Sequence, residues 1–449
     1  MVRRRGADRC SEVGRRRDGG RGRLGRSSGG AGGTSHIPVP AGCRGHTPGR
    51  RRGHGAVTMA VLGPSLDGVG GIFEDRPRPT PDVIVFVLMA ALMALGSVMV
   101  YSSTFVRLDE ETGDPTSAMR RQMIFAGVAL VTYVASSMID YRLYRRFPFL
   151  IYGIMMIALI GVLFAPPQKG ATRWIPVGAF QFQPSEFAKV ALIVALASLL
   201  TRGARRRLSW RSLGTALLMA AAPSFLIFLQ PDLGTMLVVG FITVGMLFVA
   251  GSSIRQMLVL GASGVVGVIA VFQLDILKSY QIARLAGFFD QASDLQGVNW
   301  NLYQSQIAIG SGQLVGRGLF QGTQTRLSFI PSQTTDFIFT AVGEQFGFIG
   351  GSAVILAYAI LIWRVLIVAA GAPNAFGSMI AVGMAALLAF HIFVNIGMTV
   401  GLVPVTGLPL PFMSAGGSAM IAMAGGLGIV NSVWRSRSPV SDRPEARDL

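Results

Sequence analysis

The sequence contains few charged residues, little cysteine and little histidine. Of its 449 residues only 14% are charged and 51% are hydrophobic, whereas about a quarter of an average soluble domain is charged. Both cysteines, Cys10 and Cys43, and three of the four histidines lie within residues 1–58, so His391 is the single histidine further on. A disulfide framework and a zinc site of Cys and His ligands are therefore excluded for residues 59–449.

The sequence motifs that usually bind nucleotides are also missing. The sequence contains no G-x-x-x-x-G-K motif, and none of its three lysines directly follows a glycine, which excludes ATP hydrolysis by a P-loop. It contains no D-x-D triplet, so a metal clamp for a nucleotide sugar has no support either. Any chemistry must therefore use a substrate that already carries its own energy.

The formal net charge of +18 is concentrated at the N-terminus. Residues 1–58 contain 14 arginines and only three acidic residues, among glycine and serine and without an aliphatic run. We expect this tail to be disordered. It does not resemble a signal peptide, because no apolar stretch follows its arginines before about residue 82. A second interpretation is that translation begins at Met59. In either case we expect residues 59–81 to form a cytoplasmic lead-in.

Residues 82–434 predict an all-α polytopic membrane domain. Ten apolar runs occur, many of them near the ~20 residues that a helix needs to cross ~30 Å of hydrocarbon. They cover about residues 83–103, 122–139, 148–166, 186–201, 212–230, 234–251, 256–277, 337–368, 376–402 and 412–434. The runs show no strand-like alternation, which excludes a membrane β-barrel.

Arginines predict the orientation of this domain, because cytoplasmic loops carry an excess of them. Every second connection is basic. These arginines are Arg142, Arg145 and Arg146, then Arg202, Arg205, Arg206, Arg207 and Arg211, then Arg255, Arg364, Arg435 and Arg437. Ten crossings then place both termini in the cytoplasm, including the C-terminal tail 435–449. The acidic loop at 109–111 and the long loop 278–336, between the seventh and eighth runs, face outward.

Polar residues gather on this outer side. Arg173 and Trp174 precede a proline-initiated run in which Glu186 and Lys189, three residues apart, share one helix face at its outer end. One interpretation is an ion pair at the membrane interface. The other is that Lys189 and Arg173 neutralise an anionic headgroup while Glu186 holds the lysine in place. Residues 230–235, Gln-Pro-Asp-Leu-Gly-Thr, are typical of an ordinary tight turn.

The long outer loop contains a further set of candidates. Loops of this length in a compact domain usually serve a function. Polar residues along it include Arg284, Asp290, Asp294, Gln304 and Ser305, followed by a series of glycines at 310, 312, 316 and 318. The glycines are more typical of turns than of an anion-binding backbone.

Asp336 is the last polar residue before the eighth run. Such an aspartate is commonly a helix N-cap. An aspartate where aqueous and apolar phases meet is also well placed to act as a base, because partial desolvation can raise the pKa of a carboxyl. Glu344, about two turns further, is a second candidate, since a carboxylate inside a membrane usually has a partner or a function.

Several motifs, in order over residues 82–434, resemble the SEDS family, which includes RodA and FtsW. The motifs are GATRWI, FQPSEFAK, QPDLGT, QSQIAIGSGQLVGRGLFQGTQ, TTDFIF, GEQFGFIG and GLVPVTGLPLPFMSAGGSAM. The loop that ends in GTQ and the valine in GLVPVTG are more similar to RodA, the elongation member, than to FtsW, the division member. Ala415 departs from the family, which often has tyrosine there, and we expect only local packing to differ.

The resemblance implies a peptidoglycan glycosyltransferase that polymerises lipid II on the outer face of the bacterial cytoplasmic membrane during elongation and so controls cell shape. It implies a class B penicillin-binding protein as the partner that cross-links the product. Asp336 matches the family's essential aspartate, and Arg173, Trp174, Glu186 and Lys189 match positions around the proposed substrate cavity. We therefore predict that Asp336 is catalytic. We predict that the other four residues, together with Arg284 and Glu344, bind the substrate. A divalent cation bridging the diphosphate and a carboxylate would be Mg²⁺ or Mn²⁺, which suit oxygen ligands.

Three alternatives stay open at this point. A lipid II flippase or transporter would use the same cavity but requires ionisable residues through the depth of the bundle, whereas most here lie near its outer boundary. A glycosyltransferase specific for division, of the FtsW type, would share the chemistry. A scaffold that only recruits a transpeptidase would need none of Asp336, Glu186 and Lys189.

Overall fold

The structure is a computed structural model that describes residues 81–167, 172–178, 180–202, 208–274, 279–291, 297 and 299–436. The tail expected at 1–58, most of the lead-in 59–81 and nearly all of the C-terminal tail lie outside these residues, and so do Lys169 and Asp294. Predictions about them stay predictions.

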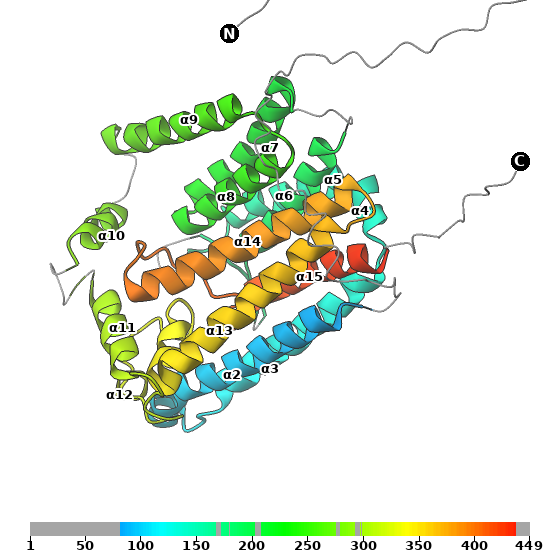
Figure 1. Cartoon of the computed structure of the whole chain (residues 1–449). Coiled ribbons are helices and arrows are strands. Elements are labelled where there is room, and N and C mark those ends of the chain that lie inside the picture. Colours follow the sequence, from blue (N-terminus) through cyan, green and yellow to red (C-terminus); the bar gives the residue numbers. More distant parts are fainter. Residues whose placement is uncertain are drawn as a thin grey trace, which may run out of the picture. The chain divides into compact units, whose positions relative to one another are not determined.

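A helix coincides with the larger part of each of the ten apolar runs (Figure 1). These helices are α2 (Val83–Thr112), α3 (Ser117–Met138), α5 (Pro148–Val162), α6 (Pro184–Leu200), α7 (Trp210–Leu229), α8 (Leu233–Val249), α9 (Ile254–Gln273), α13 (Ile338–Ala370), α14 (Ala375–Val400) and α15 (Gly417–Arg435). Shorter elements lie between them: α4 (Tyr141–Arg146), the antiparallel hairpin β1 (Ile175–Val177) and β2 (Phe180–Phe182), α10 (Ser279–Phe289), α11 (Trp300–Ser311) and α12 (Thr323–Arg326).

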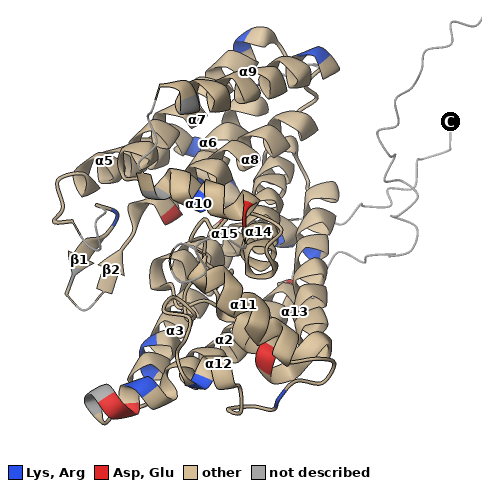
Figure 2. Cartoon of the chain, turned by 90° about the vertical axis from the view of Figure 1, so that its left-hand side faces the viewer, with Lys and Arg blue, Asp and Glu red and all other residues tan. Residues whose placement is uncertain are grey.

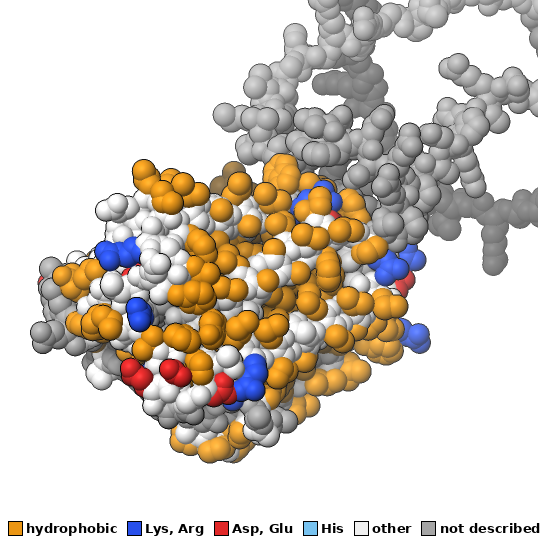
Figure 3. All heavy atoms as spheres, turned by 90° about the horizontal axis from the view of Figure 1, so that it is seen from below, with side chains coloured by type: hydrophobic (Ala, Val, Ile, Leu, Met, Phe, Trp, Pro, Cys, Tyr) orange, Lys and Arg blue, Asp and Glu red, His pale blue; other side chains and the backbone are white. Residues whose placement is uncertain are grey.

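Six helices in the described part of the chain are long and apolar enough to cross a membrane: α2, α7, α9, α13, α14 and α15. The apolar helices α5 and α8 are shorter. Figure 3 shows hydrophobic side chains spread over the face seen from below, and Figure 2 shows how sparse charged residues are along the long helices. The chain is therefore a multi-pass helical membrane protein, while the number of ten crossings stays a prediction.

The helices α14 and α15 form the centre of the bundle. In their membrane-length windows 72% and 78% of the residues are buried, against 6% for α9, which lies apart from the other long helices in Figure 1. The helix α15 packs on α3, α14 packs on α13 and α8, and α6 contacts both central helices. Polar side chains on α6 and α14 are thereby held inside the protein rather than against lipid.

One expectation about the connections was wrong. The acidic residues 109–111 are not a loop but belong to the end of α2, which continues to Thr112 and ends at Gly113 in the left-handed conformation. Glutamate and arginine favour helix, so α2 extends beyond its apolar part until a glycine ends it. The long connection expected at 278–336 contains the short helices α10, α11 and α12.

Two of the predicted basic residues, Arg364 and Arg435, lie at the same end of the bundle, whereas residues 205–207 and 437 lie outside the described part of the chain. Arg364 on α13 forms an ion pair with Asp82 at the start of α2, with 2.8 Å between Nη2 and Oδ2. Arg435 of α15 donates to the carbonyl of Ser137 near the end of α3, and the start of α14 bonds to Tyr141 of α4 through Asn374. These residues share one side, as their arginines predict. Which side of the membrane this end faces stays a prediction.

The helix α13 is interrupted at Gly347, where φ is 64° and ψ is −158°. Backbone groups of residues 313–318 pair with the interrupted helix: the amides of Phe348 and Arg317 donate to the carbonyls of Gln313 and Glu344 at 2.8 and 3.0 Å. The loop glycines permit this close approach, because a Cβ on Gly312 would lie 1.9 Å from the carbonyl oxygen of Gly343. Contact with α13, beyond turn formation, therefore accounts for this part of the glycine series.

Candidate active site

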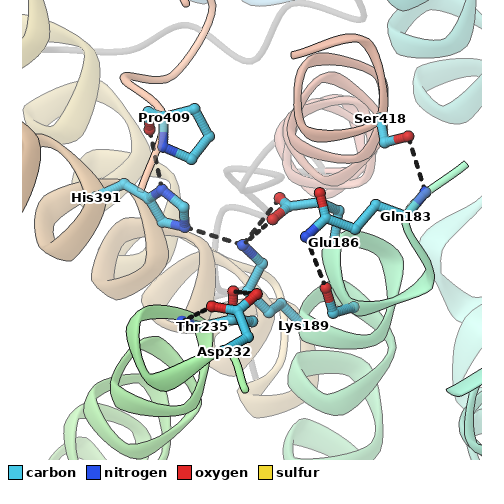
Figure 4. A network of polar contacts seen from close by, with 9 residues as sticks. Gln183, Glu186, Lys189, Asp232, Thr235, His391, Pro409 and Ser418 are labelled. Carbon is cyan, nitrogen blue, oxygen red and sulfur yellow. Dashed lines mark hydrogen bonds and ion pairs between the residues drawn. The ribbon is translucent and has the colours of Figure 1, made fainter. Parts of the chain in front are cut away.

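Glu186 and Lys189 lie on α6, directly after its initial proline, and point into the bundle. Both side chains are buried, with 3% and 1% of their surfaces exposed, and the lysine Nζ lies 2.9 Å from both carboxylate oxygens. Their three-residue spacing brings them together as the sequence predicts. The pair is not at a lipid interface, however, because the surrounding helices enclose it (Figure 4).

His391 of α14 completes this cluster and was not assigned a role from the sequence. Its Nε2 lies 3.0 Å from the Nζ of Lys189, and its Nδ1 lies 3.2 Å from the carbonyl oxygen of Pro409. The side chain is fully buried. The available signal in the sequence was a lone histidine in an apolar run; nothing local indicated that it meets a lysine 202 positions away.

The start of α6 is fixed against α15 by Ser418. The Ser418 hydroxyl accepts from the amide of Gln183 at 3.1 Å (Figure 4). It also donates to the carbonyl of Gln181 at 2.9 Å. These bonds hold the junction between β2 and α6. The junction in turn sets the direction in which the first turn of α6 presents Glu186 and Lys189.

Residues 230–232 form the expected turn, residues 233–235 begin α8, and the turn also holds Arg173. Asp232 caps α8 by accepting from the amide and the hydroxyl of Thr235 at 3.1 and 2.9 Å. The Arg173 guanidinium donates to the carbonyls of Gln230, at 2.9 Å, and Pro231, and lies 3.9 Å from the Asp232 carboxylate. Its side chain keeps 25% of its surface exposed. Arg173 is thus oriented by the protein and still accessible to a ligand, and Trp174 beside it is partly exposed.

Asp336 is not a helix N-cap. The helix α13 begins at Ile338, the N-cap position is Phe337, and no side chain caps it. The Asp336 backbone is held instead: its amide donates to Ser332 at 3.0 Å and its carbonyl accepts from Asn395 of α14 at 2.8 Å. The structural interpretation from the sequence is therefore wrong for this residue, and its carboxyl is left to other contacts.

The carboxyl of Asp336 lies among charged groups from several elements. Burial raises its pKa above the ordinary aspartate value, the hydrogen bond from Thr335 and the positive charges of Arg284 and Arg173 lower it, and the negative charge of Asp232 raises it further. The effect of burial is the largest, so the pKa of Asp336 is raised overall. Asp336, Arg173 and Arg284 therefore lie within electrostatic range of one another, as the predicted site requires.

Arg284 of α10 also lines a cavity. The cavity has a volume of about 260 Å³, and its wall includes Asn299 and Asn301 around α11 and Pro404 and Val405 from the loop after α14. Val405 packs against the cluster that contains Phe337, the neighbour of Asp336. A cavity with both polar and apolar walls therefore adjoins the segment that carries the candidate base.

Glu344, which the sequence predicts to bind the substrate, lies buried against α12 instead. It is fully buried, and its carboxylate accepts from the amides of Gln324 and Thr325 at 2.8 and 2.9 Å and from the Thr325 hydroxyl at 2.6 Å. It thus caps the first turn of α12. Among the described contacts none joins it to Lys189 or Asp336, and this geometry supports a structural role.

The described residues contain no group of three His, Cys, Asp or Glu side chains that could hold a metal ion by themselves. Asp232 and Asp336 are near enough to influence each other, but Asp232 already accepts two bonds from Thr235. A divalent cation here would need phosphate oxygens of a ligand to complete its coordination.

Comparisons with known proteins give consistent matches. The FtsW/RodA/SpoVE family model, described as "Cell cycle protein", matches residues 82–439. The chain is 35% identical over 362 residues to "Stage V sporulation protein E" of Bacillus subtilis (strain 168), covering 80% of this chain and 98% of that protein. It is 35% identical over 370 residues to "Peptidoglycan glycosyltransferase MrdB" of Escherichia coli (strain K12), covering 82% and 97%. A solved structure described as "Structural coordination of polymerization and crosslinking by a peptidoglycan synthase complex" matches with a TM-score of 0.67 and 30% identity, covering 80% and 98%.

Proposed function

The chain belongs to the FtsW/RodA/SpoVE family, and from that premise we propose that it polymerises lipid II into β-1,4 glycan strands during cell elongation. It is a peptidoglycan glycosyltransferase, in agreement with the name of its relative MrdB. The role in elongation is supported by the loop ending in GTQ and the valine in GLVPVTG. Polymerisation takes place on the outer face of the bacterial cytoplasmic membrane, at the end of the bundle opposite to the arginine-rich connections.

The observation that carries this proposal is the environment of Asp336. Its carboxyl does not cap a helix, its backbone is fixed by Ser332 and Asn395, and it lies within electrostatic range of Arg173 and Arg284. A carboxyl whose pKa is raised by burial is a better base than an ordinary aspartate, because a base works best when its pKa approaches the working pH.

These placements support the following reaction. Asp336 takes the proton of the C4 hydroxyl of the acceptor N-acetylglucosamine, and that oxygen attacks the anomeric carbon of N-acetylmuramic acid on the other chain. The new C4–O–C1 bond forms as the bond from C1 to the diphosphate oxygen breaks, which releases undecaprenyl diphosphate and inverts C1 to the β configuration. The accessible cations Arg173 and Arg284 stabilise the diphosphate charge. Lys189, whose side chain is only 1% exposed, contributes positive charge from inside the bundle.

A divalent cation fits this arrangement only together with the substrate. Asp336, with Asp232 nearby, would contribute carboxylate oxygen to Mg²⁺ or Mn²⁺, and the diphosphate would contribute the remaining oxygens. Such an ion would supply charge neutralisation for the leaving group.

The partner in this proposal is a class B penicillin-binding protein. The similar solved structure is described as a peptidoglycan synthase complex that coordinates polymerization and crosslinking. A polymerase that releases uncross-linked glycan strands requires such a transpeptidase close by. This similarity supports the assignment, and co-purification with a transpeptidase would test it.

The direct test uses the purified full-length protein and labelled lipid II, with glycan strands separated by gel electrophoresis. We expect Asp336→Asn to lower the rate by about 100-fold or more, the usual contribution of a general base. Asp114→Asn is the control, since that carboxyl lies at the surface between α2 and α3 and bonds to Arg120. Polymerisation by Asp336→Asn at the parent rate would remove Asp336 as the base. Translocation of lipid II by the parent without any glycan product would favour a flippase.

A further inference from the structure

We infer that His391 is a positioning residue, which acts as an uncharged bridge that fixes the Lys189 ammonium relative to the loop beside Asp336. This inference rests on the proposed function. The site residues predicted from the sequence include neither His391 nor the loop carbonyls that it contacts. The geometry nevertheless places the imidazole between the buried ion pair of α6 and residues 407–409, which lie against the candidate base.

The hydrogen bonds determine the protonation of this bridge. An ammonium group can only donate, so the Nε2 of His391, at 3.0 Å from the lysine Nζ, must accept. A backbone carbonyl can only accept, so the Nδ1 at 3.2 Å from Pro409 must carry the proton. A neutral imidazole with its proton on Nδ1 is the one form that satisfies both contacts. Lys189 shares its donors between Glu186 and His391.

The same helix face also holds Asp336. Asn395 lies one turn after His391 on α14, is fully buried, and donates through Nδ2 to the carbonyls of Leu408 at 2.7 Å and Asp336 at 2.8 Å. The helix α14 thereby fixes two successive loop carbonyls, those of Leu408 and Pro409, and the backbone of the candidate base with two side chains.

The loop between these contacts lies close to the reacting carboxyl. Gly407 has φ of +76°, and a Cβ placed on it would lie 3.5 Å from Oδ2 of Asp336. Residues 407–409 therefore lie between the carboxyl of Asp336 and the pair of His391 with Lys189. A shift of His391 would change both the position of the lysine charge and the wall beside the base. Small misplacements of this kind cost about 100-fold in rate when reacting groups must be held together.

Two substitutions of the histidine separate the bridge from mere volume. The amide of His391→Gln can accept from Lys189 and donate to Pro409, while His391→Met fills similar space with neither group. We expect His391→Gln to polymerise lipid II within about threefold of the parent and His391→Met to lose about 100-fold. Thr399→Val is the matched control: Thr399 is buried two turns further along the same helix, and its hydroxyl bonds only to its own helix, at Ile396. We expect it to retain the parent rate.

Each variant is compared at equal amounts of folded protein, measured by size-exclusion chromatography in detergent. Parent activity in His391→Met, or equal loss in His391→Gln and His391→Met, would overturn the inference. If His391→Met folds poorly, rescue by His391→Gln still decides the result, because glutamine supplies the two hydrogen bonds without a titratable ring. Failure of the parent itself to form glycan strands would instead refute the proposed function.

Discussion

Burial opposes ionisation of Asp336, whereas its role as a base requires the ionised form. Because the pKa of this carboxyl is higher in the folded protein than its ordinary value, stability falls as pH rises from the ordinary pKa through the folded one. Above that window the carboxylate destabilises the fold. We therefore expect Asp336→Asn to raise the free energy of unfolding near neutral pH by about 1 kcal/mol, as substitutions of active-site groups often do.

Thermal unfolding of the parent and of Asp336→Asn at pH 8 and at pH 4 checks this expectation. The advantage of the asparagine variant should be larger at pH 8, where the parent carboxyl is ionised. A lower unfolding midpoint for Asp336→Asn at pH 8 would show that the carboxylate stabilises the fold. The pKa shift would then have the opposite sign.

Glu186 and Lys189, unlike Asp336, form a buried ion pair in which each charge stabilises the other. Removal of one partner of a buried pair leaves an uncompensated charge and typically costs about 3–5 kcal/mol. We expect Glu186→Leu to lower stability by about 3 kcal/mol, since Lys189 keeps only its contact with His391. The double variant Glu186→Leu with Lys189→Met should recover most of that loss and still form no glycan strands.

Denaturation curves and the lipid II assay on the same preparations distinguish the two effects. A double variant that is stable and inactive assigns the pair to function rather than to folding. A double variant that polymerises lipid II would show that the charges serve neither substrate binding nor catalysis.

At the level of helices and loops, sequence alone was sufficient for what depends on neighbouring residues. Apolar runs predicted the positions of the long helices, and the three-residue spacing predicted the contact between Glu186 and Lys189. The interruption of α13 at Gly347, the pairing of residues 313–318 with it and the meeting of His391 with Lys189 were not predictable. Each depends on segments that are distant in sequence, and no local pattern encodes the partner.

Asp336 and Glu344 also show that local sequence does not determine contacts with distant segments. Their sequence context was similar, an isolated carboxylate near the start of an apolar run. The structure leaves the Asp336 carboxyl without a capping role but uses that of Glu344 to cap α12. Only the tertiary position of α12 separates a candidate base from a structural cap.

The contact of α11 with α13 gives a prediction with a closely matched control. A Cβ on Gly312 would lie 1.9 Å from the carbonyl oxygen of Gly343, while a Cβ on Gly310, two residues earlier, meets nothing within 4 Å. Backbone cannot give way cheaply at such a distance, so we expect Gly312→Ala to destabilise the protein by about 3 kcal/mol or more and to reduce polymerisation. Gly310→Ala should stay within about 0.5 kcal/mol of the parent.

Unfolding midpoints in detergent and the yield of folded protein check this pair of variants. Equal behaviour of Gly312→Ala and Gly310→Ala would show that α11 does not lie against α13 at this point. Because Arg317 and Gly318 donate to the carbonyls of Glu344 and Gln345 from the same segment, hydrogen exchange at residues 313–318 should increase in Gly312→Ala alone.

At the scale of the whole molecule, polarity is divided between the two ends of the bundle. Arg364 and Arg435 lie at one end, where Asp82, Tyr141 and Asn374 also lie. Arg173, Asp232 and Asp336 lie at the other end, where α8 and α13 begin. The formal charge of +18 therefore comes from residues with different roles. Much of it lies in residues 1–58, and part of the remainder orients the helices in the membrane. Only a few cations are left to bind the substrate.

This division predicts which end labelling reagents reach, because positive residues favour the cytoplasmic side. Both natural cysteines lie within residues 1–58, so replacing them with serine gives a background for single cysteines. Thr116 and Pro373 are exposed at opposite ends, between α2 and α3 and between α13 and α14. We expect an impermeant maleimide to label Thr116→Cys on intact cells and Pro373→Cys only after permeabilisation. The opposite pattern would place Asp336 inside the cell, and polymerisation on the outer face would then be impossible for this chain.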